Sequence, residues 1–177
     1  MAQKRITVFI KMKPYLKAFL ISLYGNEPIF FPKTKEAIFV NKIEKLLSKP
    51  PHDFSDVIPD EKEEYLEVIL PYFKYTNINT KNYLSENSQK IIEEQSDKLF
   101  WEAFHDHMLD SFREQISRIR AVVSFIEKYD LPYDDKIEDM LRKSIYRRKK
   151  IFSKMPKRKY TKKKSTCMAE KSTNNDN

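Results

Sequence analysis

Residues 86–129 read ENSQKIIEEQSDKLFWEAFHDHMLDSFREQISRIRAVVSFIEKY, and this stretch decides the fold class. Its apolar side chains recur every three or four residues, from Ile92 through Phe104 to Ile126, which is the spacing of one face of an α-helix. A single helix over this stretch would be about 66 Å long, too long for a compact domain of this size. The pattern therefore predicts two helices with a break near residues 110–117, although no Pro or Gly fixes the position of the break.

Three segments of the N-terminal half have the pattern of strands. Residues 5–11 and 64–75 are rich in β-branched and aromatic residues that alternate with polar ones, as in a half-buried strand. The second segment contains Pro71, which cannot donate to a sheet ladder, so we expect this strand at a sheet edge or with a bulge. Residues 28–32 begin and end with proline, which predicts an edge strand or a plain connector.

Helix signals surround these strands. Pro14 is suited to the first position of a helix, and Gly25, the only glycine of the chain, to the residue after its end. Thr34 can cap a second helix, and Ser85 or Ser88 the long helical stretch. The sequence thus predicts an α-dominant α+β fold, with a sheet of two or three strands in the N-terminal half and helix exceeding strand by at least about three to one.

The chain divides into a folding part and a polar tail. Hydrophobic residues make up 40% of the 177 residues, enough for one buried core. We expect residues 1–155 to form a single globular domain, with an α/β part at 1–81 and a helical part at 82–155. Residues 156–177 are too polar to offset their ordering entropy, which predicts a disordered tail. The only cysteine, Cys167, lies in that tail.

Positive charge is concentrated near the C-terminus. Residues 142–164 hold thirteen Lys or Arg and no acid, whereas residues 1–141 carry a net charge of −4 and the whole chain +8. A positive field this localised suits a polyanion, such as nucleic acid, an anionic membrane or an acidic protein.

The cations begin on the second of two amphipathic helices. Residues 118–129 and 136–152 both have helical spacing, and a turn with Pro132 separates them. Asp135 followed by Glu138 is a weak variant of a capping box. The pair resembles a helix-turn-helix element with a basic extension, although its turn lacks glycine. Such a helix fits the major groove of DNA, while an unstructured basic tail can follow phosphates.

We therefore predict a nucleic-acid-binding surface on this helix and tail. Its residues are Lys136, Arg142, Lys143, Tyr146, Arg147, Arg148, Lys149, Lys150, Lys154, Lys157, Arg158, Lys159, Lys162, Lys163 and Lys164. Duplex DNA is the favoured ligand. Single-stranded DNA or RNA stays open, because Tyr129, Tyr133 and Tyr146 could stack on unpaired bases. Membrane binding is disfavoured, because the apolar stripe of the helix is narrow and is needed for packing.

The sequence gives no pattern for catalysis, a cofactor or a metal. A chain with one glycine lacks the glycine-rich loops that hold nucleotide phosphates. His105 and His107 are two apart on a helix, so they point to different faces and cannot bind one ion together. Glu102 and Asp106 are four apart, and we interpret them as a solvated acidic face. Trp101, beside two phenylalanines, is interpreted as a core residue rather than a base-stacking platform.

Three stretches carry a resemblance to known proteins. They are residues 13–29 (KPYLKAFLISLYGNEPI), 125–132 (FIEKYDLP) and 145–150 (IYRRKK). Together they resemble small uncharacterised DNA-binding proteins of Bacteroidetes phages and mobile elements. The resemblance covers most of the chain, and it implies a setting in a phage or mobile element more than a mechanism.

The function predicted from the sequence is that of a non-enzymatic DNA-binding factor with a regulatory or accessory role, such as transcription regulation. The alternative is an assembly protein of a virion or complex whose basic tail contacts packaged nucleic acid or an acidic partner. Either role is compatible with a homo-oligomer. The apolar run at residues 6–10 is too short for a signal peptide or a membrane span, so we expect a cytoplasmic location, with a virion as the other setting.

Overall fold

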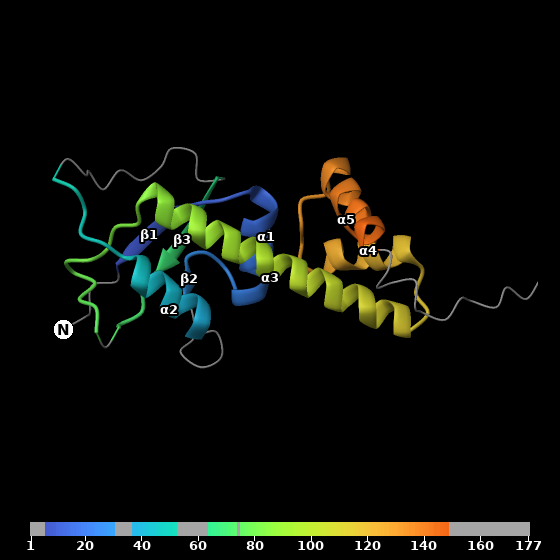
Figure 1. Ribbon diagram of the computed structural model, residues 1–177, viewed down its shortest axis with the longest axis horizontal. Coiled ribbons are helices and arrows are strands. Elements are labelled where there is room, and N and C mark those ends of the chain that lie inside the picture. The colour runs from blue at the N-terminus through green and yellow to red at the C-terminus, as the bar shows by residue number, and fades with distance from the viewer. Residues whose placement is uncertain (1–5, 31–36, 53–63, 74, 149–177) are drawn as a thin grey trace, which may run out of the picture.

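Five helices and one small sheet form the part of the chain that the computed structural model describes, residues 6–30, 37–52, 64–73 and 75–148 (Figure 1). The elements, in chain order, are β1 (Thr7–Lys11), α1 (Pro14–Tyr24), β2 (Ile29–Phe30), α2 (Ala37–Leu46), β3 (Tyr65–Ile69), α3 (Glu86–Arg113), α4 (Arg118–Lys128) and α5 (Asp135–Arg147). Helices account for 58% of the described residues and exceed strands by more than three to one, which confirms the predicted α-dominant α+β class.

The sheet has the strand order β1-β3-β2. β1 runs antiparallel to β3, with Val8 opposite Val68, and β2 runs parallel to β3, with Ile29 opposite Val68. All three side chains are buried. Because residues opposite each other in a sheet point to the same face, this row marks the face that belongs to the core. Within the segment at 28–32, residues 29–30 thus form an edge strand rather than a plain connector, and residues 31 and 32 lie outside the described residues.

β3 is the central strand, so of the two predicted consequences of Pro71, a sheet edge or a bulge, the sheet edge is wrong. The strand is five residues long and ends at Ile69, two residues before the proline. The missing N–H of Pro71 therefore takes nothing from the ladder. Leu70, the residue between them, still donates its backbone N–H to the carbonyl oxygen of Ile6 at 2.9 Å.

Helix α1 begins and ends where the sequence predicts. Pro14 is its first residue, and Gly25 follows its last with a φ of 106°. The N–H of Gly25 donates to the carbonyl oxygen of Ile21 at 2.8 Å. A side chain is strained at this φ, which explains why the only glycine of the chain stands here. The second predicted helix is present as α2, whereas its predicted cap, Thr34, lies outside the described residues.

Helix α3 runs through the length of the described part of the molecule, and the other elements are arranged along it (Figure 1). Its fully buried side chains include Ile92, Phe100, Phe104 and Met108, a row that winds around the helix by about 160° from its first member to its last. The sheet, α1 and α2 lie along its first half, and α4 and α5 lie by its second half. As a result, buried side chains from β1 through α5 belong to one continuous core cluster.

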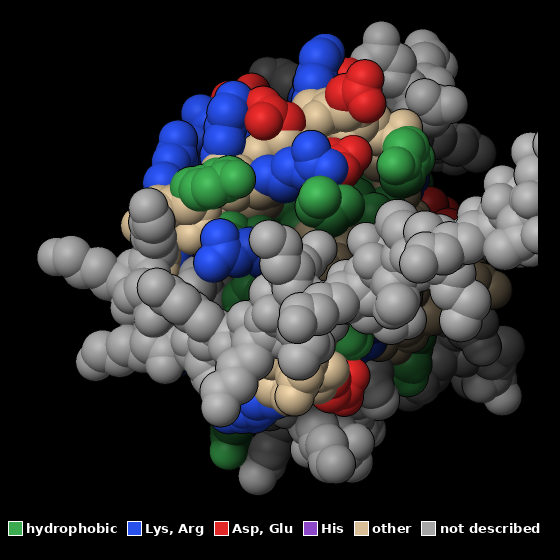
Figure 2. Space-filling view, turned by 90° about the vertical axis from the view of Figure 1, so that its right-hand side faces the viewer, with side chains coloured by type: hydrophobic (Ala, Val, Ile, Leu, Met, Phe, Trp, Pro, Cys, Tyr) green, Lys and Arg blue, Asp and Glu red, His purple; other side chains and the backbone are tan. Residues whose placement is uncertain are grey.

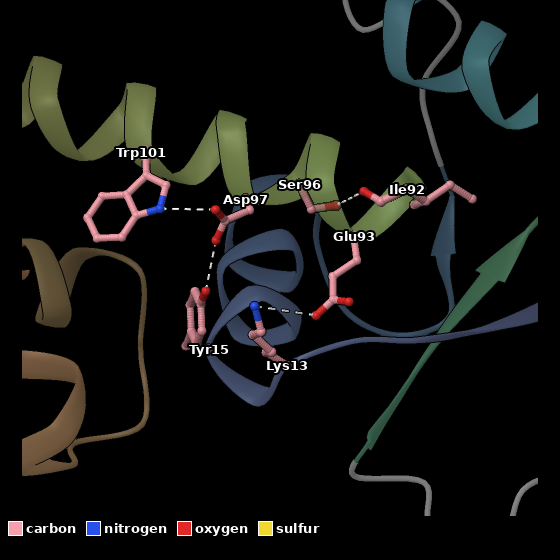
Figure 3. A network of polar contacts seen from close by, with 7 residues as sticks. All are labelled: Lys13, Tyr15, Ile92, Glu93, Ser96, Asp97 and Trp101. Carbon is pink, nitrogen blue, oxygen red and sulfur yellow. Dashed lines mark hydrogen bonds and ion pairs between the residues drawn. The ribbon is translucent and has the colours of Figure 1, made fainter. Parts of the chain in front are cut away.

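A polar network ties α1 to α3 (Figure 3). The carboxylate of Asp97 accepts the hydroxyl of Tyr15 at 2.8 Å and the indole N–H of Trp101 at 3.1 Å. Lys13 lies 3.8 Å from Glu93, one turn earlier on α3. Burial, and then the bond to Asp97, raise the pKa of Tyr15 above its ordinary value, so the hydroxyl keeps the proton that it donates. The network thus links Trp101, through Asp97, to Tyr15 of α1.

The break between α3 and α4 falls within the predicted interval. Gln115 has a φ of 60°, and its N–H donates to the carbonyl oxygen of Phe112 at 3.0 Å. The N–H of Ile116 donates to the carbonyl oxygen of Ser111 at 2.8 Å. These two bonds form a Schellman motif, here with glutamine in the left-handed position where glycine is usual. Ser117 then caps α4.

Helix α5 follows the predicted turn, but its cap differs from the prediction by one residue. Asp134, not Asp135, is the N-cap, and its carboxylate accepts the N–H of Lys136 at 3.1 Å. Asp135 is instead the first helical residue. The helix ends at Arg147, and positions 149–152 of the predicted helix lie outside the described residues, as does the predicted tail.

Candidate nucleic-acid interface

Helix α5 carries the predicted binding residues on the side away from its core contacts. Leu141 and Ile145 are buried, and Ile137 and Met140 pack beside them. The predicted binding residues that the structure describes are all exposed: Lys136, Arg142, Lys143, Tyr146, Arg147 and Arg148. The others lie outside the described residues: Lys149, Lys150, Lys154, Lys157, Arg158, Lys159, Lys162, Lys163 and Lys164.

Two cations of α5 have acidic partners on the same helix. Arg142 forms an ion pair with Glu138, one turn earlier, and Lys143 lies 2.6 Å from Asp139 in the same arrangement. The pair of Lys143 and Asp139 is exposed and contributes little to stability, so a phosphate could displace that carboxylate, whereas Glu138 is partly buried. Both pairs reduce the net charge that the middle of α5 presents to a polyanion.

The two ends of α5 therefore differ in charge. Asp134 and Asp135 stand at its start, where acids complement the positive end of the helix dipole. Arg147 and Arg148 stand at its end, and neither forms an ion pair with another residue in the described part of the chain. Helix-turn-helix proteins read bases mainly with the first residues of their recognition helix. In α5 that end is acidic, and the end suited to phosphates is the last turn.

The connection between the helices also differs from a helix-turn-helix. Residues 129–134 join α4 to α5, which is longer than the about three to four residues of that motif. Asp130 has a φ of 46°, and the N–H of Leu131 donates to the carbonyl oxygen of Ile126 at 3.0 Å. This is a second Schellman end without glycine. Pro132 follows it directly.

The three tyrosines of this region fall into two groups. Tyr133 and Tyr146 are 72% and 67% exposed. Tyr129 instead packs between Phe19 and Phe125, with ring centroids 4.9 and 4.8 Å away. Tyr129 therefore packs at the edge of the core. Of the three tyrosines, only Tyr133 and Tyr146 could stack on a base.

Two exposed arginines that the sequence-based prediction missed begin helix α4. Arg118 and Arg120 flank Ile119, which is itself 61% exposed. The guanidinium of Arg118 lies 5.9 Å from the ring centre of Phe112 on α3. Acids, not cations, are favoured in the first turn of a helix, and α4 has none there. The run Arg-Ile-Arg directly after the capping serine was the signal in the sequence that could have identified these two arginines.

Figure 2 views this end of the molecule, where Lys and Arg side chains gather with acidic and hydrophobic ones between them.

His105 and His107 have structural partners on different helices. Nε2 of His105 lies 3.2 Å from the hydroxyl oxygen of Ser144 on α5. Nε2 of His107 lies 3.1 Å from the carbonyl oxygen of Ala121 and 2.9 Å from the hydroxyl of Ser124, both on α4. As predicted, the two rings point to different faces. They attach α5 and α4 to α3.

Burial lowers the pKa of both histidines. For His105 the nearby positive charge of Arg148 lowers the pKa further, while Asp106 raises it. For His107 the hydrogen bond to Ala121 opposes the effect of burial. Both shifts favour the neutral form of the ring in the folded protein. No group of three or more His, Cys, Asp or Glu side chains within the described ranges is placed to hold a metal ion.

Trp101 packs against the core, as interpreted from the sequence, but its ring is only partly buried. Phe100 and Phe104 are fully buried, and the indole ring packs on both, with centroids 5.3 and 5.9 Å away. Its remaining surface lines a groove of about 520 Å³ together with Leu109 and Arg148. The sequence could not show this, because Trp101 is adjacent to the buried stripe of α3 rather than on it.

No protein-family model, curated protein or solved structure matches this chain. In the part of the chain that the structure describes, none of the helices has the length and apolar character needed to cross a membrane.

Proposed function

We propose that this chain is a nucleic-acid-binding protein whose contact surface is the last turn of α5 together with residues 149–164. The observation that carries this proposal is the change in charge along the chain. Arg147 and Arg148 are exposed and have no ion-pair partner among the described residues, and residues 149–164 add nine Lys or Arg without one acid. This run would contact phosphates, which give affinity that depends strongly on salt.

Duplex DNA is the proposed ligand. The exposed Tyr146 lies one turn after Arg142 and directly before Arg147, so the last turn of α5 offers an aromatic ring and guanidinium groups to a groove edge. The acidic start of α5 would stay away from the phosphates. A regulatory or accessory role in a phage or mobile element, without catalytic activity, follows from the resemblance in sequence and belongs to this proposal.

The test is to measure the affinity of the full chain for duplex DNA, single-stranded DNA, RNA and anionic vesicles at one salt concentration. Tightest binding to the duplex is expected. Tightest binding to a single strand would instead favour base stacking on Tyr133 and Tyr146. Vesicle binding as strong as DNA binding would overturn the proposal, since charge alone would then explain both.

A second candidate function, assembly of a virion or complex, is favoured by exposed aromatic side chains far from α5. Phe30 on β2 is 55% exposed, and Tyr72, just after β3, is 71% exposed. Exposed apolar side chains mark contacts with other proteins where they form one contiguous patch. Light scattering during size-exclusion chromatography separates the two candidates. A monomer or dimer fits a DNA-binding factor, whereas rings of many copies would favour assembly.

A further inference from the structure

A groove of about 520 Å³ lies on the outer side of α3. Its walls include Lys98, Trp101, Glu102 and Asp106 of α3, and Arg148 at the end of α5. Trp101 is held in place by its bond to Asp97 (Figure 3). Neither Glu102 nor Asp106 forms an ion pair with another residue in the described ranges.

The exposed surface of α3 has an uneven charge pattern. Every fourth position is charged and exposed, in a row that winds around the helix by about 40° per step: Glu86, Lys90, Glu94, Lys98, Glu102, Asp106, Asp110 and Glu114. The first half of the row alternates in sign, as expected of a solvated helix. The second half of the row, from Glu102 to Glu114, is acidic throughout. Of these four acids only Asp110 has an ion-pair partner within the described residues, Arg113 at 2.8 Å. Like charges four residues apart destabilise a helix, so a cation bound here would stabilise α3.

The nearest source of cations is the chain itself. Arg148, a wall of the groove, is the last described residue before the basic segment, residues 149–164. That segment has nine Lys or Arg and no acid. An extended chain spans about 3.3 Å per residue, so ten residues reach about 33 Å. The helix from Glu102 to Glu114 is about 18 Å long, well within that reach.

The chemistry of the groove suits a Lys or Arg side chain. Trp is the aromatic ring that attracts cations most strongly, and Glu102 and Asp106 supply two carboxylates beside it. Leu109 offers an apolar surface for the aliphatic part of a long basic side chain. Lys98 and Arg148 also line the groove, so its charged walls balance formally. The preference for a cation therefore rests on the ring of Trp101 and on the acidic row that continues to Asp110.

We propose that this groove is the docking surface for the chain's own basic segment, residues 149–164, which places Lys or Arg side chains beside Trp101, Glu102 and Asp106. The docked segment is the same one to which the proposed function assigns phosphate contacts. Nucleic acid and the groove would then compete for it. The docking itself does not depend on the proposed function, but the competition does.

Trp101 gives a direct readout, because it is the only tryptophan of the chain. Acrylamide quenching of its fluorescence is measured on the full chain from about 0.1 M to about 1 M salt, over which the Debye length falls from about 10 Å to about 3 Å. Because screening releases the segment, the quenching constant of the wild type should rise by about a factor of two. The double variant Glu102→Gln/Asp106→Asn should show the high value at both salt concentrations.

The matched control is Glu86→Gln/Glu94→Gln, which makes the same change in charge on the same exposed row, away from the groove walls. It should keep the salt dependence of the wild type. Duplex DNA is then titrated at about 0.1 M salt. The groove variant should bind DNA about three- to tenfold more tightly than the control variant. In the groove variant the basic segment is not docked, so all of the protein is free to bind DNA. Circular dichroism of both variants checks that they fold.

The outcomes separate the two proposals. Salt-independent quenching in the wild type, with equal DNA affinity of the two double variants, would overturn the docking. Quenching that falls when DNA is added would also overturn it, because the nucleic acid would then cover Trp101 itself. Salt-dependent quenching seen only at high protein concentration would place the segment of a second copy in the groove and overturn the intramolecular form. Salt-dependent quenching without any DNA affinity would support the docking and contradict the proposed function.

Discussion

Nε2 of His105 lies 3.2 Å from the hydroxyl oxygen of Ser144, and this contact joins the middle of α3 directly to α5. Ser144 is one turn before Arg148, so the contact helps to fix where the cationic end of α5 lies. With Leu141 and Ile145 buried on the same helix, the exposed side of α5 has a defined direction. The predictions below depend on that geometry.

Arg147 and Arg142 should contribute differently to DNA binding, although both are exposed arginines of α5. Arg142 is paired with Glu138, whereas Arg147 has no acidic partner among the described residues. Arg147→Ala should reduce the magnitude of the salt slope of duplex affinity by about 1, the value of one phosphate contact. Arg142→Ala should leave the slope unchanged. Equal changes in slope would show that the charge pattern of α5 does not direct binding.

The arginines that begin α4 should extend the contact surface. Arg118→Ala/Arg120→Ala should weaken duplex affinity and reduce the magnitude of the salt slope by up to about 2. Lys81→Ala/Lys90→Ala, with the same loss of charge at exposed positions of the other half of the molecule, is the control. If the control weakens binding as much as the α4 variant, these arginines act only through net charge.

Stability should fall on acidification because of the two partly buried histidines. Burial lowers the pKa of His105 and of His107 from the ordinary value of 6.5. As the pH falls, the unfolded chain therefore takes up protons before the folded one. Their contribution is complete above about pH 6.5 and is lost as the pH falls through the folded-state pKa values. Urea unfolding at about pH 7.5 and pH 5 should show this loss, and His105→Gln/His107→Gln should reduce it. An unchanged pH dependence in that variant would assign the loss to carboxylates.

The end of α4 should become more stable when its strain is removed. Asp130 has a φ of 46°, where a side chain is unfavourable, and it lies at the negative end of the helix dipole. Asp130→Gly should raise the free energy of unfolding by about 1 kcal/mol relative to Asp130→Ala, which removes the charge but keeps the strain. Equal stability of the two variants would show that the left-handed conformation costs nothing here.

Periodic features of the fold could be predicted from the sequence. The core stripe of α3 follows from apolar residues at helical spacing, and the ends of α1 follow from Pro14 and Gly25. The break after α3 could be placed only within an interval. Its Schellman motif uses Gln115 in the left-handed position, and glutamine carries no sequence signal for that conformation. The central position of β3 was likewise hidden, because strand order depends on tertiary packing and not on Pro71 alone.

The candidate site could be predicted only in part. The run of cations was plain in the sequence, but its partners were not. Glu138 and Asp139 precede the acid-free run, and only helical geometry brings them onto Arg142 and Lys143. Trp101 neighbours two core phenylalanines in sequence, yet a turn of α3 leaves part of its ring facing the groove. Which side of a long helix stays uncovered depends on where the other helices pack.

The salt dependence of duplex DNA affinity for the full chain tests nucleic-acid binding most simply. If about six cations of α5 and residues 149–164 contact phosphates, log K should fall against log salt with a slope of about −5. The affinity should also exceed that of a scrambled peptide with the composition of residues 142–164, because α3 and α4 hold the end of α5 in a fixed direction. A folded chain that binds duplex DNA no more tightly than this peptide would contradict the proposed interface.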